Sequence, residues 1–398
     1  MPGSIPARRP PPARLGRLSW SSRRLRAQVY QVGAVLLLVL AIGFLAANTL
    51  QNMRARGIQS GFDFLLQPAG FDIGEGWVRY ESIDPYWKAF VVGLVNTLRV
   101  ALIGCVLTTV LGTLLGIGRF SRNALVRGLC YVYVELFRNV PVLLQLLMWY
   151  LLFTEYLPLP AEALSVGDVA FISKNGLSFP VLVWHGGYWY GLAGLAVGVG
   201  AGIAYARVAR ARFERTGIVR PVAAVIALLA VGLTALGLLA GGVPVEFDYP
   251  FRSEIQIEGG SALSPEYLSV LLGLVLYTAA YVAEVVRAGI ASVPPGQHEA
   301  AASLGLSRRR ALRLVVLPLA LRPIIPPLTN QYLNLTKNSS LAVAVGYPDV
   351  VSIANTSLNQ TGRAVECIAI IMLVYLSLSL ATSAVMNWLN RRAALKER

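Results

Sequence analysis

Eight apolar runs, each long enough to cross a lipid bilayer as a helix, constrain this 398-residue chain more than any other feature. An α-helix rises about 1.5 Å per residue, so about 20 apolar residues span the roughly 30 Å hydrocarbon core of a membrane. The runs lie near residues 29–48, 88–118, 128–156, 188–208, 219–241, 266–290, 324–346 and 365–389. The second and third runs exceed this length and are expected to tilt or to extend beyond the lipid. The sequence therefore predicts an all-α polytopic membrane protein with about eight transmembrane helices.

Charge is scarce and unevenly placed along the chain. Charged residues make up 14% of the sequence, whereas a soluble domain carries about 25%. The formal net charge of +15 could suggest a nucleic-acid partner, but the basic residues gather between the apolar runs. That placement is typical of loops that anchor a polytopic membrane protein. We therefore expect membrane lipid as a partner and no nucleic acid.

The arginine-rich loops alternate along the chain, which predicts the orientation of the protein. The N-terminal tail, residues 119–127, residues 207–220, the segment 297–318 and the C-terminal tail are rich in arginine. The loops between them are acidic or mixed. Because short loops rich in Lys and Arg stay on the cytoplasmic side, both termini and the segment 297–318 are expected in the cytoplasm.

The motifs that would support catalysis are missing from the sequence. None of the four lysines follows a glycine, so the GxxxxGK[ST] phosphate loop is absent, and so are GxSxG and HExxH. His185 and His298 lack companions at metal-ligand spacing, and the three cysteines lie within apolar runs. We expect no catalytic residue, no metal site and no ATPase site of its own in this chain.

Ionisable residues inside the apolar runs are the candidates for a transport path. Each costs about 2.5–3.5 kcal/mol at the membrane centre, so it needs a partner or a function. Glu135 and Arg138 in the third run, and Glu284 and Arg287 in the sixth, are spaced three residues apart. This spacing places both charges on one helix face, where they can neutralise each other. Two such pairs suggest helices that line a shared polar interior, although they could equally fix helix packing or contact lipid headgroups.

The seventh run carries a further polar group, made of Lys337, Asn338, Ser339 and Ser340. Such a group could meet a substrate carboxylate, or interrupt the helix and expose backbone dipoles. Arg99 in the second run is interpreted as structural.

The segment Gln297–Pro318 is a polar interruption that we expect to form two short helices. Glu299 is expected in the first turn, where the helix dipole favours a carboxylate, and Gly305 permits a turn between the helices. The first helix is slim and alanine-rich, so it could enter a groove on a soluble protein. Alternatively, the segment could lie on the lipid surface with its arginines on headgroups. The residues alone leave both readings open.

The spacing in this segment resembles the coupling motif of binding-protein-dependent ABC importer permeases. The motif reads Glu-Ala-Ala, three residues, Gly, nine residues, an aliphatic residue, one residue and Leu-Pro. Its positions here are Glu299, Ala300, Ala301, Gly305, Val315, Leu317 and Pro318. Residues 88–157 and 265–390 resemble the five-span core of the polar amino-acid branch, including Asn96-Thr97-Leu98. The enlarged layout is similar to a permease subunit of the general L-amino-acid importers of Gram-negative bacteria.

This resemblance implies a multi-pass permease of the bacterial inner membrane that imports L-amino acids by alternating access. ATP and Mg would be bound by separate ATP-binding subunits, which dock on the coupling motif. The other implied partners are a second permease, related but different, and a periplasmic amino-acid-binding protein. An ion-coupled secondary transporter of small polar solutes is the alternative.

The resemblance also implies a division of the chain. The parts are a cytoplasmic tail (1–27), an extra span with a periplasmic segment (28–87), a first core part (88–157), a two-span insertion (158–264), a second core part (265–390) that contains the coupling loop (291–322), and a cytoplasmic tail (391–398).

Overall fold

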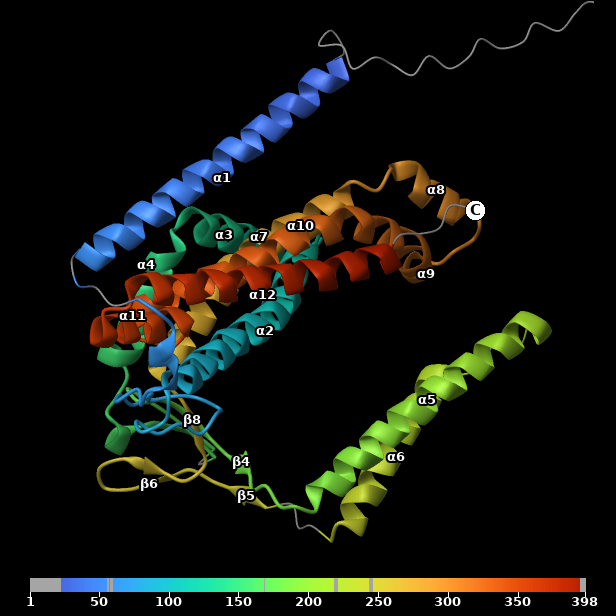
Figure 1. Ribbon diagram of the computed structural model, residues 1–398. Helices are drawn as coiled ribbons and strands as arrows, with labels where there is room; N and C mark the ends of the chain where they lie inside the picture. The colour runs from blue at the N-terminus through green and yellow to red at the C-terminus, as the bar shows by residue number, and fades with distance from the viewer. Residues whose placement is uncertain are drawn as a thin grey trace, which may run out of the picture.

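The computed structural model describes residues 23–393 except 56, 58, 59, 168, 218–220 and 243–245, and it is predominantly helical (Figure 1). The predicted tails 1–27 and 391–398 therefore lie mostly outside the described residues. Seven described helices are long and apolar enough to cross a membrane, or eight if one bent pair counts as a single span. The seven are Arg26–Met53, Tyr86–Gly118, Tyr188–Thr216, Val222–Ala240, Pro265–Ala291, Arg309–Val345 and Ala364–Arg391. The predicted all-α class and number of spans are confirmed.

The bent pair corresponds to the run at 128–156, which is not one continuous helix. Helix α3 (Ala124–Asn139) and helix α4 (Val142–Leu151, continued by a π-helical turn) meet at 103°. The break lies at Val140, which is extended, and at Pro141, whose φ is −55° and ψ 135°. Proline lacks an N–H and disfavours helical backbone in the residue before it. The third run thus bends where we expected a tilt or an extension beyond the lipid.

Six helices form the central bundle (Figure 1). They are α2 (Tyr86–Gly118), α4, α7 (Pro265–Ala291), α10 (Leu317–Asn338), α11 (Val350–Thr361) and α12 (Ala364–Ala393). Its core includes Val100, Leu146, Leu274 and Tyr347, which come from four different segments. Along α2, Gly112 and Gly116 allow the helix to approach α7 closely: a β-carbon at Gly112 would lie 2.6 Å from Val282 Cβ.

Short strands cover the end of the bundle at which α7 begins. A four-stranded antiparallel sheet has the order β1 (Leu164–Val166), β2 (Ala170–Ser173), β3 (Gly176–Phe179), β8 (Ser261–Leu263). Two small pairs join β4 (Val181–Leu182) to β5 (Phe247–Asp248) and β6 (Phe251–Arg252) to β7 (Ile257–Glu258). Sequence analysis did not anticipate these strands, because two to four residues are too few to show a period of two.

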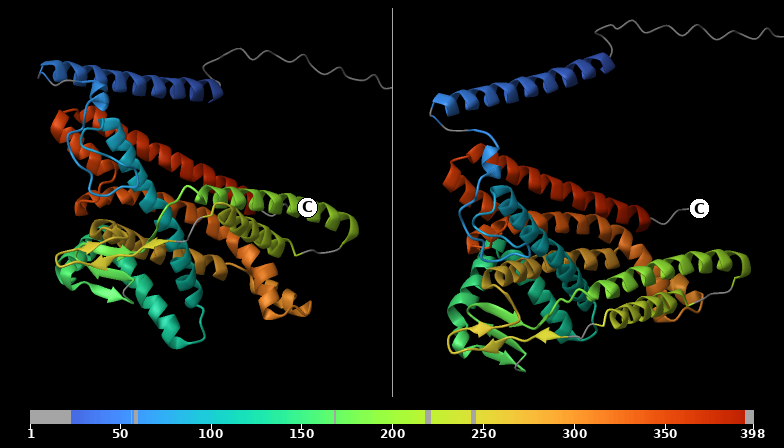
Figure 2. Two further views of the ribbon diagram at one scale, coloured as in Figure 1. Left: turned by 90° about the horizontal axis from the view of Figure 1, so that it is seen from below. Right: turned by 60° about the horizontal axis from the view of Figure 1, so that its bottom comes forward.

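Two parts of the chain stand beside the bundle. Helices α5 (Tyr188–Thr216) and α6 (Val222–Ala240) form a hairpin whose helices pack on each other and point away from the core (Figures 1 and 2). Helix α1 (Arg23–Ala55) lies apart on the other side and meets the bundle near Val365 and Glu366. Most of their apolar side chains are exposed, as expected of surfaces that contact lipid.

The close contact of α2 with α7 can be tested by Gly112→Ala. The added methyl group would lie 2.9 Å from the backbone oxygen of Ala279, so we expect a loss of roughly 1–3 kcal/mol in unfolding free energy. Gly232→Ala in α6 is the matched control, since no atom lies within 4 Å of its new β-carbon. Thermal unfolding in detergent measures both; equal midpoints would contradict the packing.

Candidate transport path and coupling segment

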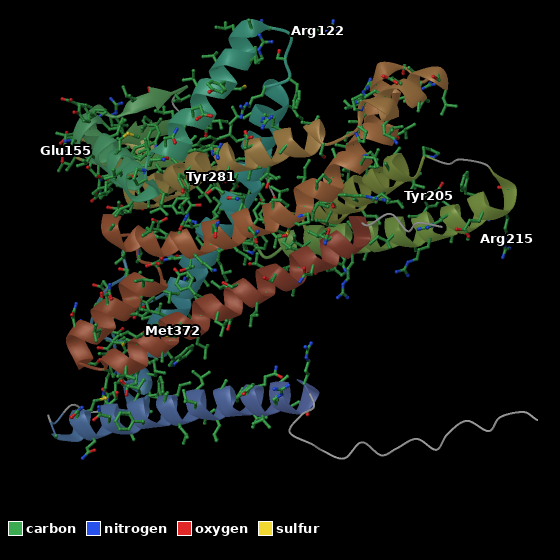
Figure 3. All side chains as sticks on the ribbon, turned by 90° about the horizontal axis from the view of Figure 1, so that it is seen from above. Arg122, Glu155, Tyr205, Arg215, Tyr281 and Met372 are labelled. Carbon is green, nitrogen blue, oxygen red and sulfur yellow. The ribbon has the colours of Figure 1, made fainter. Side chains whose placement is uncertain are left out.

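The predicted coupling segment folds into two short helices at one end of the bundle. Helix α8 spans Pro295–Ser303, and α9 spans Arg308–Ala311. The helical chain that begins with α9 does not end at Pro318, the last residue of the predicted segment. From Ala311 it continues through the π-helical turn Leu312–Val316 directly into α10. The Arg-rich turn after α2, marked by Arg122, and the last turn of α5, marked by Arg215, lie toward the same end (Figures 1 and 3).

The turn between the two helices depends on Gly305. Its φ is +69°, a left-handed conformation that glycine adopts without steric cost. The N–H of Leu306 donates to the carbonyl of Ala301 at 3.1 Å, and the N–H of Gly305 donates to the carbonyl of Ala302 at 2.9 Å. These two bonds form a Schellman motif, which closes the end of α8. Gly305 therefore fixes the direction in which α9 leaves.

All residues of α8 are exposed except one. Ala301 is 1% exposed, where α8 meets the π-helical turn, whereas Glu299 and Ala300 are exposed. Glu299 is the fifth residue of α8 and not in its first turn as expected, because the helix begins earlier, at Pro295. Past the turn, Leu317 is exposed, and Val315 and Pro318 are half-buried.

Glu284 and Arg287 form the predicted ion pair, and a third residue joins them. Arg287 Nε donates to both carboxylate oxygens of Glu284 at 3.1 Å. Arg119, directly after α2, places Nη1 2.5 Å from Glu284 Oε2. The sequence indicates only a loop anchor at Arg119, because its partner lies 165 residues away in the chain. The cluster joins α2 to α7 two turns before α7 ends at Ala291.

The ion pair predicted between Glu135 and Arg138 is not formed in the part of the chain that the structure describes. Instead, the Arg138 guanidinium lies over the ring of Tyr281 in α7, 5.3 Å from its centroid; Tyr281 is labelled in Figure 3. Asn139 Nδ2 donates to the carbonyl of Glu135 at 2.7 Å. The prediction failed because it considered one helix alone, whereas α7 offers Arg138 an aromatic face.

The group Lys337–Ser340 lies where α10 loses its α-helical form. The helix ends at Asn338 and continues as the 3₁₀ segment Ser339–Val345. Ser339 Oγ donates to the carbonyl of Thr336 at 2.7 Å, and Ser340 Oγ donates to the carbonyl of Lys337 at 2.7 Å. Both serine hydroxyls therefore satisfy backbone carbonyls where the helix type changes, while the Lys337 side chain is exposed.

An exposed polar stripe runs along α10 toward this group. Asn330, Asn334 and Lys337 are all exposed and are spaced four and three residues apart, on one helix face. Polar and charged side chains in a membrane span almost always face a bundle interior or a water-filled cavity. We therefore expect this face of α10 to contact protein or water in the assembled transporter, and not lipid. Sequence analysis identified only its last member as a site residue.

Asn96 and Thr97, part of the resemblance to the polar amino-acid branch, hold α2 to the segment before α11. Asn96 Nδ2 donates to the carbonyl of Pro348 at 2.9 Å, and the N–H of Val350 donates to Thr97 Oγ1 at 3.2 Å. Asp349 lies beside them and caps α11 through the N–H of Ser352; burial raises the pKa of its carboxyl to about 7.

Comparison with known proteins shows the family to which this chain belongs. The family model described as "Binding-protein-dependent transport system inner membrane component" matches residues 221–395. The general L-amino acid transport system permease protein AapQ of Rhizobium johnstonii is 44% identical, covering 95% of this chain and 96% of its own. The putative amino-acid ABC transporter permease YhdX of Escherichia coli is 44% identical over 96% of this chain and 98% of its own. The chain belongs to this family.

A third relative and a solved structure are also similar to this chain. The glutamate/glutamine/aspartate/asparagine permease BztB of Rhodobacter capsulatus is 37% identical over 98% of this chain and 99% of its own. A solved structure titled "Crystal structure of an amino acid ABC transporter with histidines" is 20% identical, with a TM-score of 0.46, covering 77% of this chain and 95% of that one.

Family membership defines the general role of this permease. It is the multi-pass inner-membrane subunit of an ABC importer that works with ATPase subunits and a binding protein. ATP is bound by the separate ATPase subunits, so the permease has no ATPase site of its own. The predicted family and role are thereby confirmed, and the secondary transporter is set aside.

The permease should lose stability when its three-residue cluster is broken by Glu284→Gln. The change leaves Arg119 and Arg287 without their carboxylate, so we expect a loss of roughly 1–3 kcal/mol in unfolding free energy. Glu214→Gln is the control, because the Arg210–Glu214 pair is separated by 3.7 Å and its side chains are 84% and 68% exposed. Such a pair is worth about 0–1 kcal/mol. Equal thermal midpoints for the two variants would argue against the cluster.

Proposed function

We propose that this permease imports L-amino acids by alternating access, as one of two related but different permease subunits that enclose the path. The observation that carries the proposal is the exposed coupling helix α8, which the turn at Gly305 connects to α9; α9 then continues without a break into α10 and its polar stripe. The cargo class follows from the relatives: AapQ is named for general L-amino acids and BztB for glutamate, glutamine, aspartate and asparagine.

In this proposal α8 docks into a cleft of an ATPase subunit through Glu299, Ala300 and the turn at Gly305. Closure of the ATPase pair on ATP pulls the two coupling helices together. The motion reaches the path along the continuous helix α9–α10, because a helix transmits displacement along its axis with little loss. The Glu284 cluster joins α2 to α7 near the same end, so these helices move together.

The topology proposed with this mechanism places both termini and α8 in the cytoplasm and the strands in the periplasm. The clustering of Arg-rich loops at the end that carries α8 supports it (Figure 3). We also propose that residues 88–157 and 265–390 are the permease core and that 158–264 is an insertion. The separate packing of the α5–α6 hairpin supports this division.

The path itself is proposed to run along the exposed stripe of α10, covered by the second permease subunit. Lys337 then supplies a positive charge for a substrate carboxylate, with Asn338, Ser339 and Ser340 at the change of helix type. The Glu284–Arg287 cluster lies toward the cytoplasmic end of the same path, and Glu135 and Arg138 flank it on α3.

The coupling role can be tested with Glu299→Lys and Gly305→Ala in the full transporter. The first reverses an exposed charge; the second strains a residue whose φ is +69°, at a cost of roughly 1–2 kcal/mol. We expect both to lower uptake and binding-protein-stimulated ATP hydrolysis severalfold, with unchanged affinity of the binding protein for its ligand. Glu214→Lys, an exposed acid at the end of α5, is the control. Normal ATP-dependent uptake in both variants would rule out the coupling role.

The path can be tested with Lys337→Met in proteoliposomes. Loss of a charged hydrogen bond to substrate costs about 1.5–3 kcal/mol, so uptake should fall roughly 10- to 100-fold while the complex still assembles. Lys174→Met, at the turn between β2 and β3, should transport normally. Equal uptake by the two variants would remove Lys337 from the path.

A further inference from the structure

An arginine buried inside α2 is held by a glutamate from outside the bundle. Arg99 is 6% exposed, and its Nη1 lies 2.6 Å from Glu75 Oε1. Two aromatic rings flank the guanidinium, Tyr267 at 3.9 Å and Trp77 at 4.9 Å from the ring centroids. Arg99 Nε is buried and has no hydrogen-bond partner in the described part of the chain. Arginine offers five N–H donors suited to bidentate capture of a carboxylate, and Glu75 does not satisfy all of them.

Glu75 lies in the external loop before α2, which is anchored on α2 and α11 by apolar side chains such as Phe64, Phe71 and Ile73. The contacts of the Glu75 carboxylate itself are polar. Its second oxygen accepts a hydrogen bond from Ser264, and its carbonyl accepts from Asn96 Nδ2 at 2.9 Å. Gly74 and Gly76 stand on either side; a β-carbon at Gly76 would meet Val92 at 2.9 Å, so glycine lets the loop approach α2. The Glu75 carboxylate can therefore leave Arg99 by rotation of its own side chain, while the apolar anchors of the loop stay in the core.

Ser264 connects this contact to the start of α7. The same hydroxyl oxygen accepts the N–H of Tyr267 and caps the helix, and β8 leads directly into it. The Glu75 carboxylate thus links three elements: the external loop, α2 through Arg99, and the first turn of α7 through Ser264.

A cavity of about 400 Å³ is lined in part by Glu75. Its polar lining includes Asp72, Glu75, Ser264, Glu266, Ser352 and Thr356. Carboxylates in this wall suit an ammonium group, and Arg99 directly behind Glu75 suits a carboxylate. Together they complement the two charges of a zwitterion, and the volume falls within the range of small-molecule sites.

We propose that Arg99 is the external receptor for the α-carboxylate of an incoming amino acid, and that Glu75 occupies this receptor while the path is closed. The amino acid enters the cavity with its ammonium toward Asp72 and Glu266, and its carboxylate displaces that of Glu75 from Arg99. Displacement loosens the tie to Ser264 and allows the outer ends of α2 and α7 to separate. The site lies outside the polar stripe of α10. The inference rests on the proposed function, of which it specifies the entry step.

The test measures binding of a tritiated L-amino-acid mixture to the purified full transporter without binding protein or ATP. Glu75→Gln removes the competing charge and keeps the side-chain shape. If Glu75 occupies the receptor nine-tenths of the time, its removal raises apparent affinity about tenfold. Arg99→Gln, alone or combined with Glu75→Gln, should abolish this gain and leave only the binding that the Lys337 site supports. Glu81→Gln, an exposed acid of the same external segment, should bind like the wild type.

Carboxylate recognition is tested on the wild type by competition, so the result does not depend on the folding of any variant. Unlabelled L-glutamine should displace the label, whereas glutamine with its α-carboxylate converted to an amide should not. Displacement by the amide, or unchanged binding by a Glu75→Gln protein with a normal melting curve, overturns the receptor. If uptake with binding protein and ATP persists in that case, only this inference fails; if the wild type shows no uptake, the proposed function itself fails.

Discussion

In a bilayer every backbone N–H and C=O must find a partner within the protein, and this requirement explains where the permease can depart from an α-helix. At two departures a side chain takes up the freed groups. At the break between α3 and α4, Gln145 Nε2 donates to the carbonyls of Phe137 and Val140 at 3.0 and 2.9 Å. At the end of α10, Ser339 does the same for Thr336. Polar residues in these spans therefore have a structural function besides any contact with substrate.

The same requirement governs charge. Each of three arginines in or next to α2 and α3 is matched by a carboxylate or an aromatic face from a distant segment: Arg99 by Glu75, Arg119 by Glu284 and Arg138 by Tyr281. Each match ties α2 or α3 to α7 or to the loop before α2. Charge neutralisation and helix packing are thus achieved by the same contacts. Lys337 differs, since it is exposed on the face of α10 that we assign to the path.

Much of this architecture could be predicted from the sequence, because membrane spans and the coupling motif are local signals. The spans follow from runs of apolar residues, and the helix–turn–helix at Gly305 follows from a glycine whose φ must be positive. The partners of Arg99 and Arg119 could not be predicted, since they lie 24 and 165 residues away and no periodicity connects them. The bend at Pro141 does have a local signal, a proline within an apolar run. Counting the length of that run cannot detect the bend, because it treats residues 128–156 as one continuous helix. The strands are too short to leave a pattern.

The pairing of β3 with β8 has a consequence for how such a permease could have grown. Phe179 lies opposite Ser261, so the two ends of the chain between them, including the whole α5–α6 hairpin, emerge side by side. Opposed residues of antiparallel strands are only about 5 Å apart, a gap that a tight turn can bridge. The hairpin is thus attached to the protein at a single point, where its two ends meet. Related permeases could gain, lengthen or lose it during evolution without any change in the position of the bundle helices.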